Sequence, residues 1–511
     1  NVQSLRLPSP LSSRNMCCWQ ASRNMVGCRL TQHRIILETS QSILFDDILG
    51  YEVEEDSSVV SVVYYPLVKN KRLRKEARIE MENRREAMDL LHVIEDRCRL
   101  PRPPHCPDND LRHALVVVNP FSGKKLAKKL WKKVAEPVLL DGGWLCDVIE
   151  TTHPAHAVQI AQEMDLDKYH MILVDSGDGL VTEVLRGLIL RRDRDRALKV
   201  PIGHLPGGTS NALASAICYA CNEPFSPRDG FMREAALMAA RPAYRPLSLF
   251  RAEVEDSEPM PMFMSLTFGL IADIDIESER FRCLGMIRLH LEAILRIAQL
   301  PTTSNFHVRI SYIPVGDAEL NRKTMLKHTV EREEFGPGHF DCVPVEEYDG
   351  HATPDGVFAS MREALAPSTS FTPLLPPLDQ PISSDEFTVV EGDYVFACAN
   401  SLSHLGSDLA YLPSAKLDED DIFYLTLIDW RLIKHRLEVG ILMSTIDNSH
   451  HLDYPCFQVI PVRACRIEPL SGSTGNVAVD GEPLGKDKAF QVEALPFKAT
   501  VIGRKEVERP S

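Results

Sequence analysis

The chain has 511 residues, which is too long for one hydrophobic core and predicts roughly two to four domains. The net charge of −15 argues against nucleic acid as the main partner, because a phosphate backbone attracts positive charge. No membrane-spanning run or signal peptide stands out, and the 13 cysteines show no metal-ligand or disulfide spacing, so we expect free thiols in the cytoplasm.

The first hundred residues divide into two stretches of different character. Residues 1–28 lack any periodicity and predict a disordered leader. Residues 29–105 combine short apolar runs with a charged helix expected over about Lys75–Arg99, and Leu100–Pro104 reads as a stiff linker. Small strands capped by one helix favour a regulatory module that is pleckstrin-homology-like, with an irregular regulatory extension as the alternative. The expected strands are Arg34–Leu37, Ser42–Phe45 and Ser57–Tyr65.

Residues 110–245 alternate apolar runs with amphipathic ones, which predicts a three-layer α/β nucleotide-binding domain with a mostly parallel sheet. Ligands of such sheets bind at the carboxyl ends of the strands. The expected strands are Ala114–Asn119, Leu145–Thr152, Met171–Val174 and Val200–Pro206.

Three loops follow these strands at that edge. In Asp175–Gly179, the glycines permit a tight turn, and a helix start places the carboxylate of Asp178 beside N–H groups that favour phosphate. In Gly207–Asn211, Thr209 or Ser210 is expected to cap the next helix. Neither GxxxxGK[ST] nor GxGxxG is present, which disfavours the usual P-loop and a nicotinamide site. Together with Asn119–Gly123, these loops predict phosphoryl transfer.

Residues 246–505 lose the alternation and read as an antiparallel, β-sandwich-like domain interrupted by an insertion. The insertion, about 321–385, is rich in proline, serine and acids and is expected to be disordered. The expected strands are Leu247–Val254, Met262–Leu270, Phe306–Ile313, Phe387–Ala399, Asp421–Leu427, Gln458–Ile467 and Ala489–Ile502.

Ser176–Gly179, with Asn119-Pro120 and Gly207–Asn211, resembles the diacylglycerol-kinase-type catalytic domain shared by several lipid kinases. The segment Ser265–Arg288 is similar to the sphingosine-recognition segment of sphingosine kinases, and Val477–Glu482 is similar to their last nucleotide-contacting motif. The resemblance covers about residues 114–313 and 387–502. It departs from the family at Phe121, where many members have Arg, and at Ser210, where Gly is common.

The resemblance implies a lipid kinase that transfers the γ-phosphate of ATP, with Mg²⁺, to the primary hydroxyl of sphingosine or a related sphingoid base, giving sphingosine 1-phosphate. It makes Asp178 the base that accepts the hydroxyl proton and Asp275 the contact to the amino and hydroxyl head group. A carboxylate suits an ammonium group, which ceramide and diacylglycerol lack. The alternatives are a ceramide or diacylglycerol kinase of the same fold, or a non-catalytic lipid-binding relative. The ligands of the metal are not fixed by the sequence.

The remaining site residues are carried over by motif. Asp178 is expected to face a cleft between the two domains, and the helical stripe Leu284, Ile287, Leu291, Ile294 and Leu295 to help form a tunnel for the lipid tail. The substrate residues are Ser176, Gly177, Gly179, Asp275, Ser265, Phe268, Ile271 and Ile274. The nucleotide residues are Asn119, Pro120, Phe121, Thr151, Thr152, His153, Pro154, Ala155, Glu183, Gly208, Thr209, Ser210, Arg282, Arg288, Asp480, Gly481 and Glu482.

The same resemblance implies partners and a location. A kinase acting on a membrane lipid is expected to be cytoplasmic and to visit the membrane surface peripherally. Residues 288–300 alternate basic and apolar side chains where relatives bind calmodulin. A homodimer is left open.

Overall fold

The computed structural model describes residues 23–25, 27–39, 41–69, 71–106, 112–121, 127–223, 231–284, 287–300, 306–316, 345–350, 356–367, 371–382, 386–407, 409–419 and 421–504. The chain divides into two compact units. Unit 1 comprises Asn1–Pro66 and Leu73–Arg99, and unit 2 comprises Leu67–Arg72 and Leu100–Ser511. Among the described residues, no helix has the length and hydropathy needed to cross a membrane.

Unit 1 contains two small antiparallel sheets and one helix, α1 (Arg84–Arg97). Strand β6 alternates half-buried and buried side chains, and α1 contributes Ala87, Leu90 and Ile94 to the same core. Asn83 begins the helix by accepting a hydrogen bond from the N–H of Glu86. The strands are β1 (Arg23–Met25), β2 (Cys28–Leu30), β3 (Arg34–Leu37), β4 (Ser42–Leu44), β5 (Ile48–Val53), β6 (Val59–Tyr64) and β9 (Lys75–Glu80).

Two expectations for this region need correction. The predicted helix over Lys75–Arg99 begins only at Arg84, because Lys75–Glu80 forms β9 and pairs with β6, which buries Ile79. Strand β1 also lies inside the stretch expected to be a leader, whereas residues 1–22 lie outside the described residues. The likeness to a pleckstrin-homology module stays a prediction.

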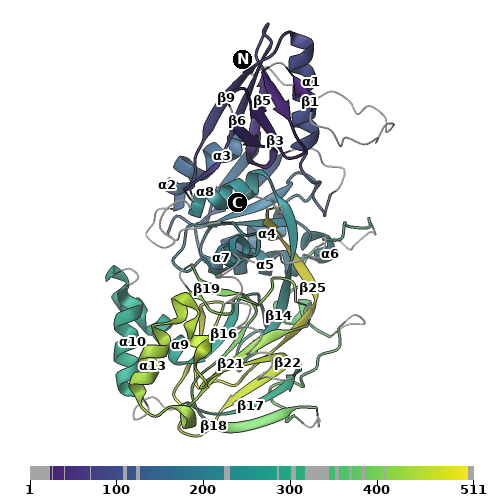
Figure 1. The fold of residues 1–511 in the computed structure, drawn as a ribbon. Coiled ribbons are helices and arrows are strands. Elements are labelled where there is room, and N and C mark those ends of the chain that lie inside the picture. The colour runs from purple at the N-terminus through teal and green to yellow at the C-terminus, as the bar shows by residue number, and fades with distance from the viewer. Residues whose placement is uncertain are drawn as a thin grey trace. The chain divides into compact units, whose positions relative to one another are not determined.

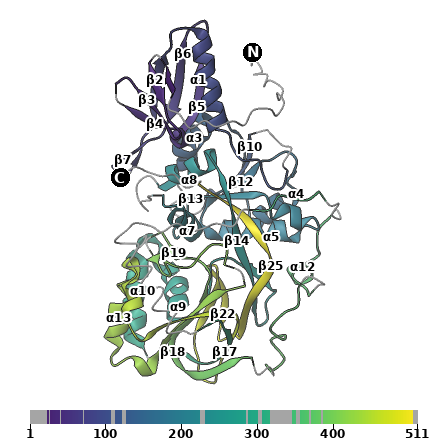
Figure 2. The same cartoon turned by 45° about the vertical axis from the view of Figure 1, so that its right-hand side comes forward.

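Unit 2 begins with the predicted parallel sheet, in the order β11-β10-β12-β13. Both faces of this sheet are covered: helices α3 and α8 lie on one side, and α4 and α5 lie on the other (Figure 2). The strands are β10 (His113–Val118), β11 (Leu145–Glu150), β12 (Met171–Ser176) and β13 (Pro201–Pro206). The helices are α2 (Ala127–Leu130), α3 (Glu136–Asp141), α4 (His156–Glu163), α5 (Asp178–Leu190), α6 (Arg194–Ala197), α7 (Ala212–Ala220) and α8 (Phe231–Ala240).

The second part of unit 2 is antiparallel, as predicted. Long strands β18 and β22 each pair with β17 along one half and with β21 along the other, which folds the sheet around an apolar core (Figure 1). The strands are β14 (Ala243–Val254), β15 (Met260–Met262), β16 (Ser265–Gly269), β17 (Phe306–Pro314), β18 (Thr388–Asn400), β19 (His404–Gly406), β20 (Leu409–Ala410), β21 (Phe423–Asp429), β22 (Phe457–Pro469), β23 (Asn476–Val479), β24 (Glu482–Lys486) and β25 (Phe490–Gly503). The helices are α9 (Leu270–Ser278), α10 (Ile287–Gln299), α12 (Met361–Ala364) and α13 (Arg436–Met443).

One strand joins the two parts of unit 2 into a continuous fourteen-stranded sheet. The end of β25 pairs in parallel with β13 at Thr500 and Val501, and its beginning pairs antiparallel with β22. Strand β14 runs antiparallel to β25 from Ala243 to Val254. The predicted boundary at residues 245 and 246 is therefore not a break in the sheet.

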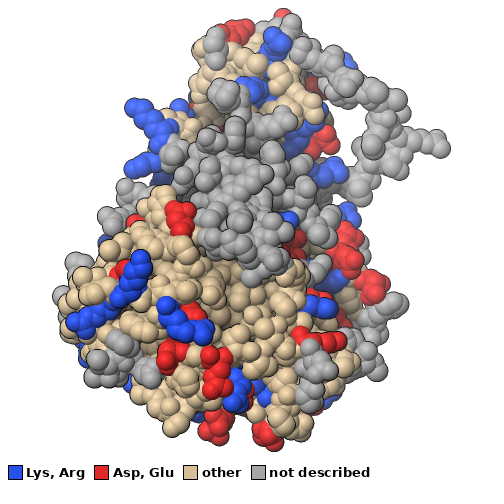
Figure 3. Space-filling model, turned by 60° about the horizontal axis from the view of Figure 1, so that its bottom comes forward, with Lys and Arg blue, Asp and Glu red and all other residues tan. Residues whose placement is uncertain are grey.

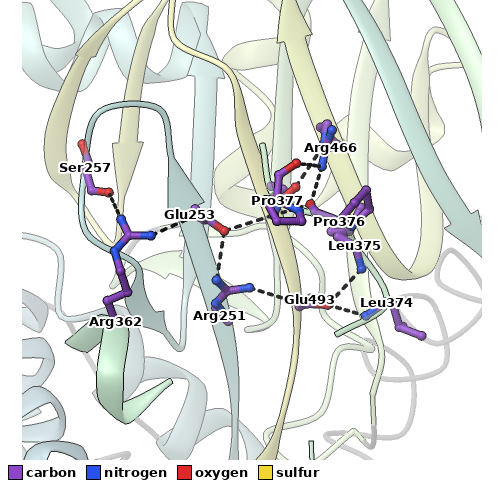
Figure 4. A network of polar contacts seen from close by, with 11 residues as sticks. Arg251, Glu253, Ser257, Arg362, Leu374, Leu375, Pro376, Pro377, Arg466 and Glu493 are labelled. Atoms are coloured by element: carbon purple, nitrogen blue, oxygen red, sulfur yellow. Dashed lines mark hydrogen bonds and ion pairs between the residues drawn. The ribbon is translucent and has the colours of Figure 1, made fainter. Parts of the chain in front are cut away.

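The insertion predicted to be disordered over 321–385 contains an ordered strap, which we define as residues 371–382. Residues 317–344, 351–355, 368–370 and 383–385 lie outside the described residues. Arg466 of β22 donates hydrogen bonds to the carbonyl oxygens of Pro376 (2.5 Å), Pro377 (3.0 Å) and Gln380 (2.6 Å) (Figure 4). Glu493 of β25 accepts from the N–H groups of Leu374 and Leu375. Proline removes N–H groups but keeps carbonyls, so a proline-rich segment suits a buried arginine.

Candidate active site

The first loop at the carboxyl edge of the parallel sheet follows β10. The Asn119 side chain accepts a hydrogen bond from the N–H of Phe121 (2.9 Å), which forms a tight turn. The Asn119 N–H in turn donates to the carbonyl of Asp175 at the end of β12 (3.3 Å). Phe121 is 63% exposed, and its apolar side chain adds no polar group at this edge.

The second and third loops meet backbone to backbone. A Cβ atom on Gly208 would lie 2.3 Å from the Cα of Gly177, so only glycine permits this approach. Asn211 adopts a left-handed conformation (φ 53°) and accepts a hydrogen bond from the Gly208 N–H (2.9 Å). The two predicted glycine loops are therefore in direct contact.

The carboxylate of Asp178 lies at the start of two helices. It is the first residue of α5, and its two oxygens accept hydrogen bonds from the N–H groups of Ala212 and Leu213 at the start of α7 (both 3.0 Å). Thr209 and Ser210, expected to cap α7, are exposed, and the cap of that helix is supplied by Asp178. Asp178 is only 5% exposed, and the expectation that it faces a cleft stays a prediction.

A histidine that the sequence analysis overlooked lies beside this carboxylate. His204 of β13 is buried, its Nε2 is 3.0 Å from the carbonyl oxygen of Ser176, and its Nδ1 is 3.8 Å from Asp178 Oδ1. Burial lowers the pKa of His204, and the Asp178 carboxylate opposes that effect. In the sequence, His204 sits in an apolar strand and resembles a core residue, so no signal distinguished it.

The last nucleotide motif forms a turn between β23 and β24. Asp480 (φ 48°) accepts hydrogen bonds from the N–H groups of Phe263, Met264 and Ser265, at 2.9–3.1 Å. Burial raises the pKa of Asp480 to about 7, and the negative charge of Asp178 contributes in the same direction. The joint role of Asp178 and Asp480 at a nucleotide stays a prediction.

A charged group on α5 links two other predicted positions. Glu183 accepts a hydrogen bond from the N–H of Ala157 (3.2 Å), just after the predicted loop Thr151–Ala155. Burial raises the pKa of Glu482, while Arg186 opposes the shift and Glu183 adds to it. Arg186 was not predicted, and its Nε is buried without a hydrogen-bond partner among the described residues.

The predicted head-group residues lie around α9. Asp275 is half-buried, and burial raises its pKa, with Arg288 opposing and Glu279 adding to the shift. Arg288 is buried and forms an ion pair with Glu279, so its assignment to the nucleotide stays a prediction. The side chain of Arg282 lies outside the described residues.

The neighbouring Asp273, which the sequence analysis did not select, is more deeply buried than Asp275. It accepts hydrogen bonds from the backbone N–H and the side-chain Nδ2 of Asn476, at 3.0 and 2.6 Å. These bonds join α9 to β23 at Asn476, the residue immediately before the last nucleotide motif. Asp273 thus has a structural partner, and the role of Asp275 stays a prediction.

The apolar residues predicted to hold the lipid tail lie in different surroundings. Phe268 and Ile274 belong to the buried core, and the Phe268 ring contacts those of Phe306 and Phe490. On α10, Ile294 is 67% exposed and Leu295 is 37% exposed. The side chains of Leu284 and Ile287 lie outside the described residues, so the tunnel wall and the tail-binding residues stay predictions.

Carboxylates at this edge do not by themselves make a metal site. Both oxygens of Asp178 and of Asp480 accept backbone hydrogen bonds, and the described residues contain no cluster of three side chains able to hold a metal ion. Mg²⁺ is typically bound through one or two carboxylates together with substrate phosphates. We therefore derive no step through a resident metal.

The residues 113–234 match the model of the diacylglycerol kinase catalytic domain. Over 399 residues the chain is 35% identical to sphingosine kinase 2 of Arabidopsis thaliana, covering 74% of this chain and 70% of that one. It is 29% identical over 401 residues to human sphingosine kinase 1, covering 78% of this chain and 90% of that one.

A crystal structure of a diacylglycerol kinase from Bacillus anthracis aligns with a TM-score of 0.42 at 15% identity, covering 78% of this chain and 98% of that one. The sequence comparisons span both the parallel and the antiparallel parts of unit 2. The chain therefore belongs to the sphingosine kinase family.

Proposed function

We propose that this chain transfers the γ-phosphate of ATP, supplied as its Mg²⁺ complex, to the primary hydroxyl of sphingosine or a related sphingoid base. Membership of the sphingosine kinase family supports this class of reaction. We infer the location of the active site from Asp178, whose carboxylate lies where the two glycine loops meet.

Asp178 acts as the base in this proposal. A carboxylate has about four lone-pair sites, and two are used by the N–H groups of α7, so others remain for a substrate hydroxyl. The lipid O–H bond breaks as the oxygen bonds to the γ-phosphorus, the proton passes to Asp178, and ADP leaves with the electrons of the broken P–O bond. The fixed N–H donors hold the carboxylate in one orientation throughout.

Asp275 selects the substrate by charge. The half-buried carboxylate is available to pair with the ammonium group of a sphingoid base, which ceramide and diacylglycerol cannot offer. A ligand cation would also offset the cost of burying that carboxylate. This pairing supports sphingosine over the other lipids that related kinases phosphorylate.

The test is an activity assay on Asp178→Asn and on the control Asp195→Asn, an exposed aspartate in the same part of unit 2. We expect Asp178→Asn to lower kcat by about a hundredfold or more, with ATP binding retained, because asparagine fills the same space but cannot take the proton. Wild-type turnover in Asp178→Asn would overturn the assignment of the base.

A second assay compares sphingosine, ceramide and diacylglycerol as acceptors. We expect the wild-type protein to phosphorylate sphingosine, and Asp275→Asn to raise the KM for sphingosine more than that for ATP. Phosphorylation of ceramide but not sphingosine would overturn the substrate, while leaving the kinase assignment intact.

Peripheral membrane binding is supported by one exposed apolar surface, which we call the α10–α13 surface. Ile294 of α10 and Leu437 and Ile441 of α13 are each more than half exposed, on helices that contact each other. Figure 3 shows that uncharged residues dominate this end of unit 2, with basic and acidic side chains scattered among them. Monomeric proteins rarely expose contiguous apolar patches of this kind without a partner.

Helix α10 is also the segment predicted to bind calmodulin. Binding to anionic vesicles is measured by co-sedimentation, and binding to calmodulin is measured on immobilised calmodulin. The two partners are thus tested separately. If the α10–α13 surface binds membranes, Leu437→Ser with Ile441→Ser lowers vesicle binding, because α13 lies outside the calmodulin segment. Vesicle binding that is unchanged in this variant would contradict the membrane role.

A further inference from the structure

His204 is a buried histidine that faces the proposed catalytic base. Its Nε2 lies 3.0 Å from the carbonyl oxygen of Ser176, and a carbonyl oxygen only accepts hydrogen bonds. The hydrogen of the neutral ring must therefore be on Nε2. This leaves Nδ1 as a bare acceptor, directed at Asp178 Oδ1 from 3.8 Å.

No group in the described part of the chain donates a hydrogen bond to His204 Nδ1. His204 Nδ1 is buried and has no hydrogen-bond partner, and the only charged group acting on the ring is Asp178. The groups around Asp178 are the N–H donors of α7 and the carboxylate of Asp480. Two acceptors thus face each other in a dry site, an arrangement that one proton would convert into a hydrogen bond.

We propose that His204 is a positioning residue that receives the substrate proton through Asp178. The inference rests on the proposed function, because it needs Asp178 to be the base. When the lipid hydroxyl attacks the γ-phosphate, its proton passes to Asp178, whose O–H then donates to His204 Nδ1 and shares the proton with the ring. The proton leaves to solvent after ADP and the phosphorylated lipid depart, which restores the starting state.

The arrangement predicts the direction in which the pH–rate profile moves when the imidazole is removed. The active form carries no proton on either member of the pair, and protonation of either member inactivates it. The imidazole gives the inactivating proton a second site to bind. Removal of the imidazole is expected to move the acidic limb of the pH–rate profile to lower pH.

The experiment measures single-turnover rates between pH 5 and 9 for the full chain and for His204→Gln, whose amide can still donate to the Ser176 carbonyl. We expect the rate to fall about tenfold, the acidic limb to move to lower pH, and the KM values for ATP and sphingosine to stay within about twofold. A wild-type rate and profile would overturn the proposal, as would a loss confined to KM.

A matched control is His105→Gln, because His105 is buried in the same unit, has its Nε2 2.9 Å from a carbonyl oxygen, and leaves Nδ1 without a hydrogen-bond partner among the described residues. We expect no change in its profile. If His204→Gln does not fold, rates of the wild-type protein in H₂O–D₂O mixtures decide: a curved dependence on deuterium content indicates two protons in motion, and a linear one contradicts the relay.

The two proposals fail in different ways. Asp178→Asn that retains turnover defeats the proposed base and this relay together. Asp178→Asn that is inactive, beside His204→Gln that behaves as wild type, leaves the base in place and removes only the role of His204.

Discussion

Asp175 and Asp178 are three residues apart, but their carboxylates have opposite surroundings. Asp178 accepts two backbone hydrogen bonds, whereas both oxygens of Asp175 are buried without a partner in the described part of the chain. Asp175 Oδ1 lies beside Gly207, only 2.7 Å from where a Cβ of that residue would be. Burial raises the pKa of Asp175 to about 7.

This difference predicts how stability changes with pH. Because the folded-state pKa of Asp175 lies above its unfolded value, the folded protein binds the proton more tightly, and stability falls as pH rises from about 4 to about 7. Asp175→Asn removes that loss. We expect the melting temperature of the variant to exceed the wild-type value by more at pH 8 than at pH 5. In free energy of unfolding, the gain is expected to reach up to about 4 kcal/mol. An equal difference at both pH values would contradict the assignment.

The sequence predicted the motifs at this edge but not their mutual contacts. Ser176–Gly179 was recognisable because an aspartate stands between two glycines after an apolar run, and Gly207–Asn211 because a glycine pair with Thr, Ser and Asn follows another. The bond from Asp178 to the start of α7 joins residues 34 positions apart, and no local pattern reports such a contact. His204 was missed for the same reason, since a single polar residue in an apolar strand gives no hint of its neighbour.

At the scale of elements, tertiary pairing overrode local pattern in two places. Lys75–Glu80 carries charges at a spacing that a helix tolerates, yet it forms β9 because β6 offers a complementary edge. The strap was expected to be disordered from its proline and serine content, yet Arg466 and Glu493 bind its backbone. Strand β3, whose pattern is local and apolar, was predicted with the correct bounds.

The guanidinium of Arg466 donates to three carbonyl oxygens of the strap, while Glu493 accepts from two of its N–H groups. Arg466→Ala leaves the carbonyls of Pro376, Pro377 and Gln380 without this donor, and the loss of a buried charged partner costs about 2–4 kcal/mol. We expect a lower melting temperature and faster proteolysis within residues 371–382. Arg463→Ala, which removes an exposed arginine of the same strand, serves as the control. Equal proteolysis of the two variants would show that Arg466 does not hold the strap.

At the scale of the whole molecule, a short hairpin from the N-terminal sequence belongs to unit 2. The hairpin consists of β7 (Leu67–Val68) and β8 (Lys71–Arg72). Arg72 is buried and forms ion pairs with Glu223 (2.9 Å) and Glu234 (3.1 Å), which Arg504 also approaches. Burial and the neighbouring Glu223 raise the pKa of Glu234, while Arg72 and Arg504 oppose the shift, so the ionised form of this acid depends on the two arginines.

Loss of Arg72 is therefore expected to destabilise unit 2, although Arg72 lies far in sequence from the acids that it pairs with. Arg72→Ala removes one of the two arginines that approach these buried acids, Arg504 being the other, and breaking such a pair costs about 3–5 kcal/mol. The melting temperature and kinase activity of the variant are compared with those of Lys71→Ala, an exposed neighbour. Adding Glu234→Gln to Arg72→Ala is expected to recover part of the loss. A variant as stable as Lys71→Ala would contradict this role.

The position of β25 in the sheet has a consequence for biosynthesis. Its residues complete the edge of β13 and also pair with β14, where Ala243 lies opposite Gly503. A ribosome releases these residues only after those of β13, β14 and β22, so neither sheet region acquires its full set of neighbours until β25 has been made. Pairing over such long sequence separations folds slowly. Nascent chains that stop before β25 are thus expected to expose the edge of β13 and to require chaperones.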